Sequence, residues 1–295
     1  MTVAVPTYTG LVGRNAVVEI TNTLDSKVRV PVSQAGGVWY VNGDDLYGLS
    51  DEESTITIPV KSDYDYTVDM PAWITGEKVK EGYNFTLTEN TTGNARKGTV
   101  IFKSQKGTKE ITFVQFGVND IAGTYEATYS TFGEGDDWVS ETVKIELLQD
   151  EENEAVFYAD GLSSIRGVVL PLKFDGETYQ LSALNGQYLG FIESQKWYLY
   201  TIVRSEAGYV HADTSLSYPA IAELDVDDEE LMPFFPFKDK KGFSFTGETG
   251  TIKSFIDAIG VYVFASKSPT FGNNNNLGYY DIFKGLSIKK IKADH

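Results

Sequence analysis

The chain has 295 residues, a net charge of −17 and no cysteine. This length allows two domains of ordinary size, and 41% hydrophobic residues can build their cores. The lack of cysteine excludes disulfides, thiolate metal sites and cysteine nucleophiles. The chain has two histidines, His211 and the terminal His295. A His-ligated zinc or a Ser-His-Asp triad would depend on His211 alone, so we expect no catalytic residues, no metal and no other cofactor.

The charge distribution bears on possible partners. Residues 1–119 hold 11 bases and 14 acids (−3), and the remainder holds 14 bases and 28 acids (−14). Such a surface disfavours nucleic acid and anionic membranes, which bind clustered Lys and Arg. No run of 18 apolar residues exists to span a bilayer. The first ten residues lack signal-peptide features and begin in a strand-like pattern, so we expect the natural chain to start upstream.

Strand signals dominate the chain, as alternating or β-branched runs closed by Gly, Asn and Asp turns. The clearest runs are residues 16–20, 27–32, 54–60, 99–102, 110–114, 142–148, 167–174 and 197–203. Residues 250–264 are ambiguous, because apolar residues at helical spacing are followed by a strand-like run from Val261. Either a short helix or a single turn leads into a strand there.

One hairpin pattern occurs twice in the first part of the chain. The copies are 13-GRNAVVEITNTLDSKVRVPVSQAGG-37 and 94-NARKGTVIFKSQKGTKEITFVQFG-117. Aligning Gln34 with Gln115 places Val30 beside Ile111 and Val32 beside Phe113. We interpret residues 1–37 as the closing strands of a partial module and 45–117 as a second, nearly complete copy. The short alternating strands predict an antiparallel immunoglobulin-like β-sandwich, and we expect the closing Gln to bond backbone at a sheet edge.

The second copy resembles the BACON family, a Bacteroidetes-associated module of carbohydrate-active and other surface proteins. The matching segments are 56-ITIPVKSDYDYTV-68, 71-PAWI-74, 90-NTTGNAR-96 and 110-EITFVQFG-117. Tyr66 and Trp73 occupy positions where the family usually has aromatic residues, commonly Trp at the first. The closing family signature is matched by 114-VQFG-117, whereas the first copy keeps only the hairpin and 33-SQAG-36.

The resemblance implies an extracytoplasmic location, on the outer-membrane surface or secreted. It implies a lipoprotein of Bacteroides type, whose only membrane contact is a lipid anchor upstream of this chain. The family is associated both with carbohydrate binding and with a spacer role. Trp73 follows Pro71 in an apolar stretch, where Trp is more often core than sugar platform, so we favour the spacer.

Residues 120–295 form the larger, acidic part, which resembles no family that we recognise. Its many strands predict an antiparallel β-barrel or a jelly-roll-type sandwich of unassigned function. The run 225-DVDDEE-230 lacks the Gly and the spaced Glu of a calcium-binding EF-hand loop, so we interpret it as a solvated acidic loop. The apolar 233-PFFPF-237 is expected to pack across a barrel mouth or under this loop, unless it is exposed as a partner site.

Two loops of this part combine aromatic rings with carboxylates or amides, as sugar recognition requires. The candidate carbohydrate-binding residues are Asp136, Asp137, Trp138, Asn274, Tyr279 and Tyr280. The asparagine run 273–276 can equally be a flexible turn without a ligand.

We therefore expect a monomeric, all-β, non-catalytic protein of glycan-utilisation type. Its sandwich modules would present a C-terminal domain to a polysaccharide or other glycan. A purely structural or adhesive surface protein is the alternative. A glycoside hydrolase with two carboxylates is a third interpretation, although nothing in the sequence selects the pair.

Overall fold

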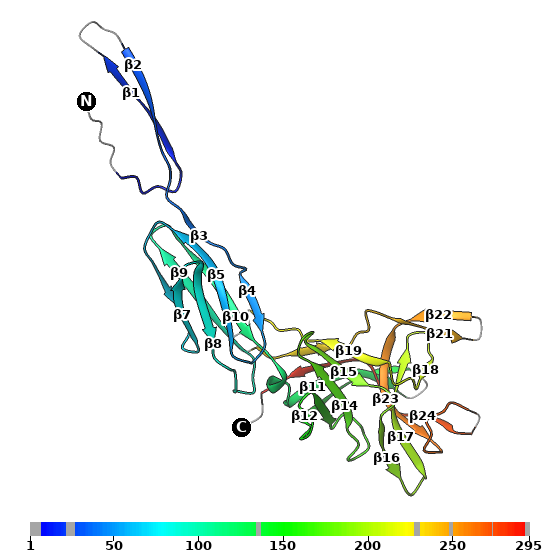
Figure 1. Ribbon diagram of the computed structural model, residues 1–295. Coiled ribbons are helices and arrows are strands. Elements are labelled where there is room, and N and C mark those ends of the chain that lie inside the picture. The colour runs from blue at the N-terminus through cyan, green and yellow to red at the C-terminus, as the bar shows by residue number, and fades with distance from the viewer. Residues whose placement is uncertain are drawn as a thin grey trace. The chain divides into compact units, whose positions relative to one another are not determined.

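The computed structural model describes residues 7–21, 27–133, 137–226, 231–247, 250–272 and 274–292 (Figure 1). Apart from the 3-10 helix η1 (Val118–Asp120), its regular elements are β-strands, which confirms the all-β prediction. The chain divides into two compact units, Met1–Asn90 with Lys97–Gln115, and Thr91–Arg96 with Phe116–His295. Within the described ranges, no helix has the length and apolar character needed to cross a membrane.

The first unit contains a two-stranded ribbon and two four-stranded sheets. Its strands are β1 (Arg14–Thr21), β2 (Lys27–Gln34), β3 (Trp39–Val41), β4 (Leu46–Leu49), β5 (Ser54–Ser62), β6 (Tyr66–Asp69), β7 (Ile74–Val79), β8 (Gly82–Leu87), β9 (Arg96–Ser104) and β10 (Gly107–Gln115). The strand orders are β1-β2, β4-β10-β9-β6 and β3-β5-β8-β7. All pairs for which a register is given are antiparallel except β4–β10, which is parallel.

The two four-stranded sheets pack face to face as a β-sandwich. Alternate residues of each strand point into the shared core because side chains alternate along a strand. One sheet contributes Ile58, Ile74, Phe85 and Leu87, and the other contributes Val100, Phe102, Ile111 and Phe113. Tyr66 and Trp73 pack against this core, as expected for a scaffold. A β-carbon on Gly98 would lie 2.7 Å from the Trp73 ring, so glycine allows the close approach of the indole.

Gln115 links the two sheets of the sandwich through hydrogen bonds. Its side chain is fully buried, and Nε2 donates 3.1 Å hydrogen bonds to the carbonyls of Glu52 and Thr88. These carbonyls lie just before β5 and just after β8, whereas Gln115 ends β10 of the opposite sheet. The prediction that Gln115 bonds to backbone groups is confirmed, but these groups flank the two inner strands of the sheet and not an edge strand.

The second unit is built on one large antiparallel sheet. Its strands are β11 (Gly123–Phe132), β12 (Trp138–Gln149), β13 (Val156–Asp160), β14 (Leu170–Asp175), β15 (Gln180–Leu184), β16 (Tyr188–Ile192), β17 (Trp197–Ser205), β18 (Val210–His211), β19 (Ser217–Ile221), β20 (Phe234–Pro236), β21 (Phe243–Gly247), β22 (Gly250–Ser254), β23 (Ile256–Phe264) and β24 (Asn276–Lys290). Twelve of these strands form the sheet, and β21–β22 form a separate hairpin.

The large sheet curls into a closed circuit. Among the described strands, the path β24-β11-β12-β13-β14-β15-β19 is continuous. Two antiparallel bridges, Ala220↔Phe237 and Glu223↔Phe234, join β19 to the segment of β20, and β20 pairs with β24. Eight strands thus complete a barrel, one of the two closures predicted from the sequence.

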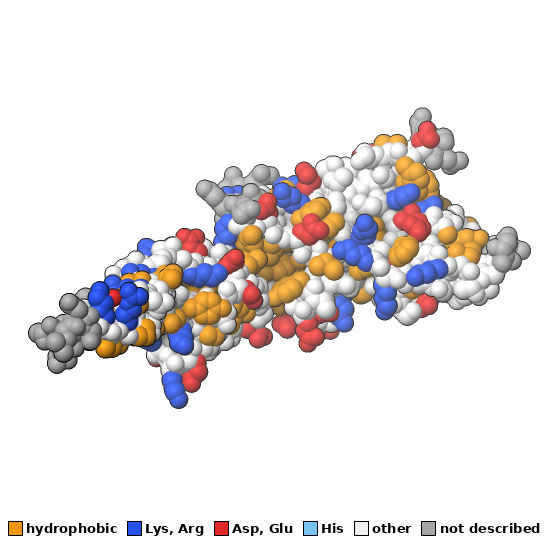
Figure 2. Space-filling model, turned by 90° about the horizontal axis from the view of Figure 1, so that it is seen from above, with side chains coloured by type: hydrophobic (Ala, Val, Ile, Leu, Met, Phe, Trp, Pro, Cys, Tyr) orange, Lys and Arg blue, Asp and Glu red, His pale blue; other side chains and the backbone are white. Residues whose placement is uncertain are grey.

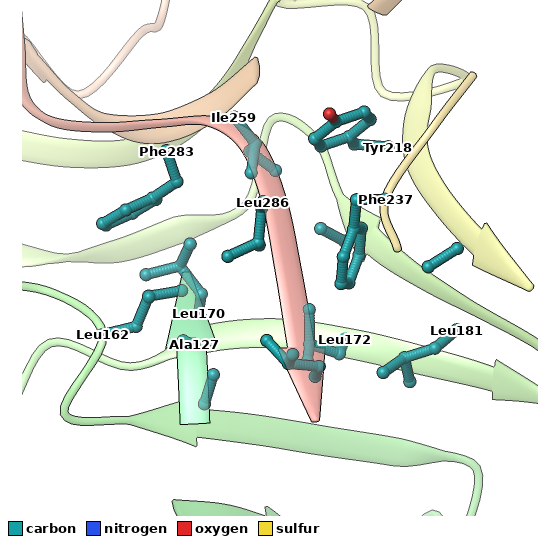
Figure 3. Close-up of a cluster of buried hydrophobic side chains, with 14 of the residues drawn as sticks. Ala127, Leu162, Leu170, Leu172, Leu181, Tyr218, Phe237, Ile259, Phe283 and Leu286 are labelled. Atoms are coloured by element: carbon teal, nitrogen blue, oxygen red, sulfur yellow. The ribbon is translucent and has the colours of Figure 1, made fainter. Parts of the chain in front are cut away.

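Side chains fill the interior of this circuit (Figure 3). Residues from different strands meet there, including Ala127, Leu170, Leu172, Leu181, Tyr218, Phe237 and Leu286. Phe235 and Phe237 of the apolar run 233–237 are buried in the same core, which confirms that this run packs inward. Residues 227–230 of the neighbouring acidic run lie outside the described residues.

Strands β16, β17 and β23 extend the sheet beyond the barrel. Strand β23 pairs with the first half of β24, from Asn276 to Lys284, and with β17 on its other side. Residues 250–264 form β22 and β23, separated at Phe255, so the helical alternative was wrong. The apolar residues at helical spacing belong to two consecutive strands instead.

We expect the second unit to depend on the core side of β24. Phe283 is buried against Tyr129, with ring centroids 4.9 Å apart. Phe283→Ala should lower the free energy of unfolding by about 3–5 kcal/mol, through lost burial and a cavity. Urea denaturation of the full chain measures this. The control is Leu277→Ala, half-exposed on the same strand, which should change stability by less than about 0.5 kcal/mol. Equal effects of the two substitutions would contradict this assignment of the core.

Candidate functional site: an aromatic sheet face

Two rows of aromatic side chains cross the extension of the sheet. They arise because alternate residues of β17 and β23 face away from the barrel core, while Leu199 and Val263 face into it. Cross-strand pairing aligns these residues into rows over β16, β17, β23 and β24. The first row is Tyr188, Tyr200, Tyr262 and Tyr279, and the second is Phe191, Tyr198 and Phe264.

The rings of the two rows are in mutual contact. Tyr188 lies 5.3 Å from Tyr200, and Phe191 lies 4.6 Å from Tyr198. Tyr200 meets Phe264 edge to face at 5.7 Å, and Tyr262 meets Tyr279 edge to face at 4.7 Å. These are the centroid separations at which aromatic pairs attract one another. Together they make one connected aromatic face.

The loop 265–275 covers the middle of this face. Its Phe271 ring lies 5.7 Å from Tyr262 and 5.6 Å from Phe264. The Tyr200 hydroxyl donates to the carbonyl of Lys267. Asn275 holds the loop in shape, because its Nδ2 donates to the carbonyls of Ser268 (2.7 Å) and Thr270 (3.0 Å). Tyr200, Tyr262 and Phe264 are buried as a result.

The outer aromatics remain accessible. Tyr188 is 50% exposed, Phe191 38% and Phe271 39%, and Tyr198 is half-buried between them and the covered rings. We call Tyr188, Phe191, Tyr198 and Phe271 the aromatic platform. Tyr188 and Phe271 contact buried rings, and Phe191 contacts the half-buried ring of Tyr198.

Burial controls the protonation of the inner tyrosines. It raises the pKa of Tyr200, Tyr262 and Tyr279 above the ordinary value of 10.0. The Tyr262 hydroxyl donates to the side-chain carbonyl of Asn276, and that of Tyr279 donates to the carbonyl of Ile202 at 3.2 Å. These phenols therefore stay neutral at physiological pH and act as hydrogen-bond donors.

A charged cluster lies on the same face, toward the barrel. Arg204, four residues beyond Tyr200, donates from Nη1 to both carboxylate oxygens of Asp257, at 3.0 and 2.7 Å. Lys284 Nζ lies 3.6 Å from the same carboxylate. Both cations also contact the Trp138 ring, at 5.4 Å for Arg204 and 4.5 Å for Lys284. The Trp138 indole is thus in contact with both cations and with the tilted ring of Phe132, 4.7 Å away.

A hollow of about 620 Å³ continues from this cluster. It opens along the edge of β24 between Lys284 and Ser287, where β23 begins and β20 ends. Asp257, Lys284, Lys238, Lys240 and Glu206 contribute charges of both signs to its lining. Figure 2 likewise shows acidic and basic side chains interspersed with apolar ones over the face that it presents.

The structure places the sequence-predicted site residues as follows. Asp136 lies outside the described residues, and Asp137 and Asn274 are exposed. Trp138 is half-buried in the charged cluster, and Tyr279 belongs to the first aromatic row. Both lie on the face that carries Arg204. Tyr280 is half-exposed and meets Trp197, which packs against the barrel core, so it belongs to the opposite side.

The sequence interpretation named none of the four platform residues, and of the two aromatic rows it named only Tyr279. Tyr198 and Tyr200 alternate visibly in 197-WYLYTIV-203, and Tyr262 and Phe264 alternate in 261-VYVF-264. These alternations could have indicated an aromatic face on each strand. The sequence does not show that strands some 60 residues apart pair with each other, so the two aromatic rows could not be predicted from it.

His211 was the remaining candidate for nucleophilic or metal chemistry. Its ring lies edge to face against Phe243 (4.8 Å) and Phe245 (4.6 Å) of the β21–β22 hairpin. Nε2 lies 3.2 Å from the hydroxyl of Ser205, which is fully buried and also bonds to the carbonyl of Tyr209. His211, held by Ser205, thus packs the β21–β22 hairpin against β18. Among the described residues, no group of three His, Asp or Glu side chains is arranged to hold a metal ion.

Comparisons with known proteins add little to this geometry. No family model matches the chain, and no curated protein matches it. A crystal structure of a protein of unknown function from Bacteroides ovatus aligns over 80% of this chain and 93% of its own, with 10% identity and a TM-score of 0.24. A similarity this low defines neither fold nor function.

Acidification should loosen the β21–β22 hairpin. Burial lowers the pKa of His211 below its ordinary 6.5, although Asp213 favours the protonated form. The closed hairpin favours neutral His211, so this contribution to its stability is fully present above pH 6.5. It is lost as the pH falls below 6.5, because His211 of the opened hairpin binds a proton at a higher pH than His211 of the closed one. Hydrogen exchange of β21–β22 amides should therefore be faster at pH 5.0 than at pH 7.5, after correction for intrinsic rates. This difference should shrink in His211→Gln; an unchanged difference would contradict the prediction.

Proposed function

We propose that the second unit is a non-catalytic carbohydrate-binding domain and that the aromatic platform is its binding surface. The observation that carries the proposal is the pair of aromatic rows with exposed outer rings. Aromatic rings bind the apolar CH faces of sugar rings, and polar groups at their edges bond to the hydroxyls. The platform offers such rings on an open sheet face, with Tyr hydroxyls beside them.

The geometry favours an extended chain of sugars over a single residue. Tyr188, Phe191 and Phe271 are separate exposed rings, which contact Tyr200, Tyr198 and Phe264 beneath them. An open row of rings lets successive sugars of a polysaccharide make similar contacts. Arg204, Asp257 and Lys284 lie on the same face and supply hydrogen-bonding groups of both charges.

For the first unit we propose a spacer role. Its resemblance to the BACON family is compatible with a scaffold, since Tyr66 and Trp73 pack against the sandwich core. On this proposal the protein acts outside the cytoplasm, on the outer-membrane surface or secreted, with a lipid anchor upstream. The first unit then holds the binding domain away from the anchor.

A polysaccharide panel tests the proposed binding. In affinity electrophoresis, the full chain should be retarded by at least one soluble polysaccharide. Tyr188→Ala combined with Phe191→Ala should raise the dissociation constant about 10-fold or more. The reason is the loss of roughly 0.5–1.5 kcal/mol of stacking per ring, in addition to the lost burial.

The matched control for this experiment is Tyr40→Ala, an equally exposed aromatic of the first unit. It should leave binding unchanged. Retardation that survives the double substitution but fails in Tyr40→Ala would move the site to the first unit. Lack of binding to every polysaccharide would overturn the proposal in favour of an adhesive or structural protein.

A further inference from the structure

The β1–β2 ribbon has the same pairing register as the last hairpin of the sandwich. Arg14 lies opposite Gln34 in the ribbon, and the Arg14 guanidinium donates to Gln34 Oε1. In the sandwich, β9 and β10 run from Arg96 to Gln115, and the hydroxyls of Thr99 and Thr112 meet across them at 3.2 Å. This places Arg96 opposite Gln115. The sequence repeat is therefore also a repeat of strand pairing.

The shared register identifies equivalent side chains on one face of each hairpin. In the sandwich this face holds Val100, Phe102, Ile111 and Phe113, which are fully buried. The equivalent residues of the ribbon are Val18, Ile20, Val30 and Val32. All are apolar and all point to one side, because pairs two residues apart share a face. The ribbon thus carries the core face of a sandwich.

This apolar face is open to solvent in the ribbon. Val30 is 41% exposed and Val28 60%, while Val18, Ile20 and Val32 are half-buried. The opposite face carries Glu19 with its ion pairs to Lys27 (2.8 Å) and Arg29 (3.0 Å). These charged side chains are well solvated on the surface of the ribbon. A two-stranded ribbon with one apolar face is marginally stable until a second layer covers it.

The sandwich shows what covers this face in a complete module. Ile58, Ile74, Phe85 and Leu87, from β5, β7 and β8, pack on the β9–β10 face. These strands all precede β9 in the chain. A covering sheet for the ribbon would by the same order precede β1.

We infer that the apolar face of β1–β2 is a docking surface for an apolar β-sheet of the β5–β8–β7 kind, supplied by residues encoded immediately upstream of this chain. The ribbon supplies the closing hairpin, and the upstream strands supply the opposing layer. The product is a second immunoglobulin-like sandwich, which precedes the sandwich of β3–β10 in the chain. The inference rests on the internal repeat and is independent of the proposed carbohydrate site.

Hydrogen exchange of the β1–β2 amides tests this inference in two forms of the protein. One is the present chain, and the other carries in addition the roughly 50 residues encoded upstream, about the length of Trp39–Leu87. Exchange should be fast in the present chain and at least about 10-fold slower in the longer one, because docking protects the ribbon. Equal exchange rates in the two forms would overturn the inference.

Two matched substitutions locate the contact. Val30→Asp places a charge on the apolar face, whereas Val17→Asp places it on the opposite face, where Val17 pairs with Pro31. In the longer chain, Val30→Asp should abolish the protection and Val17→Asp should preserve it. Equal effects would overturn the inference. A concentration-dependent dimer of the present chain that Val30→Asp dissociates would also overturn it, in favour of a second copy as the occupant.

Discussion

The double use of β24 is the constraint on which the second unit depends. Along one edge, β24 pairs with β11 from Lys284 to Lys290. Along the other edge it pairs first with β23, up to Lys284, and then with β20, from Ser287. Gly285 lies between these two partners in the left-handed conformation (φ 60°), which glycine adopts without strain. One strand therefore closes the barrel and also carries the sheet extension.

This division gives the extension two different faces. Its inner face continues the barrel core through Leu199, Ile259 and Phe283. Its outer face lies beyond the barrel wall and is free to collect the aromatic rows. Apolar side chains pack the interior of the barrel. The proposed function uses the outer face, where Tyr188 and Phe271 contact buried rings.

The sequence predicted what local patterns determine. Alternation and turn residues predicted the strands, and the repeated hairpin predicted the sandwich and the bonding of Gln115 to backbone groups. The position of Trp73 against the core also followed from its apolar neighbourhood. Each of these features depends on residues close together in the chain or on a comparison of two similar segments.

The remaining features depend on long-range pairing. Residues 250–264 looked ambiguous because the apolar residues of two consecutive strands fell at helical spacing. Alternation along β24 places Tyr279 and Tyr280 on opposite faces, and only the pairing of Tyr279 with Tyr262 shows that Tyr279 is the one on the aromatic face. Trp138 was chosen for its neighbouring carboxylates, yet its ring is held by Arg204 and Lys284, which lie 66 and 146 residues further along the chain.

Hydrogen exchange of the full chain with and without a saturating polysaccharide tests the central claim most directly, namely that the outer face of the extension is the recognition surface. Protection should appear in residues 188–200 and in the loop 265–275, and the sandwich strands Trp39–Gln115 should exchange as before. Protection confined to the sandwich, with residues 188–200 unchanged, would show that the first unit binds the glycan and would contradict the account.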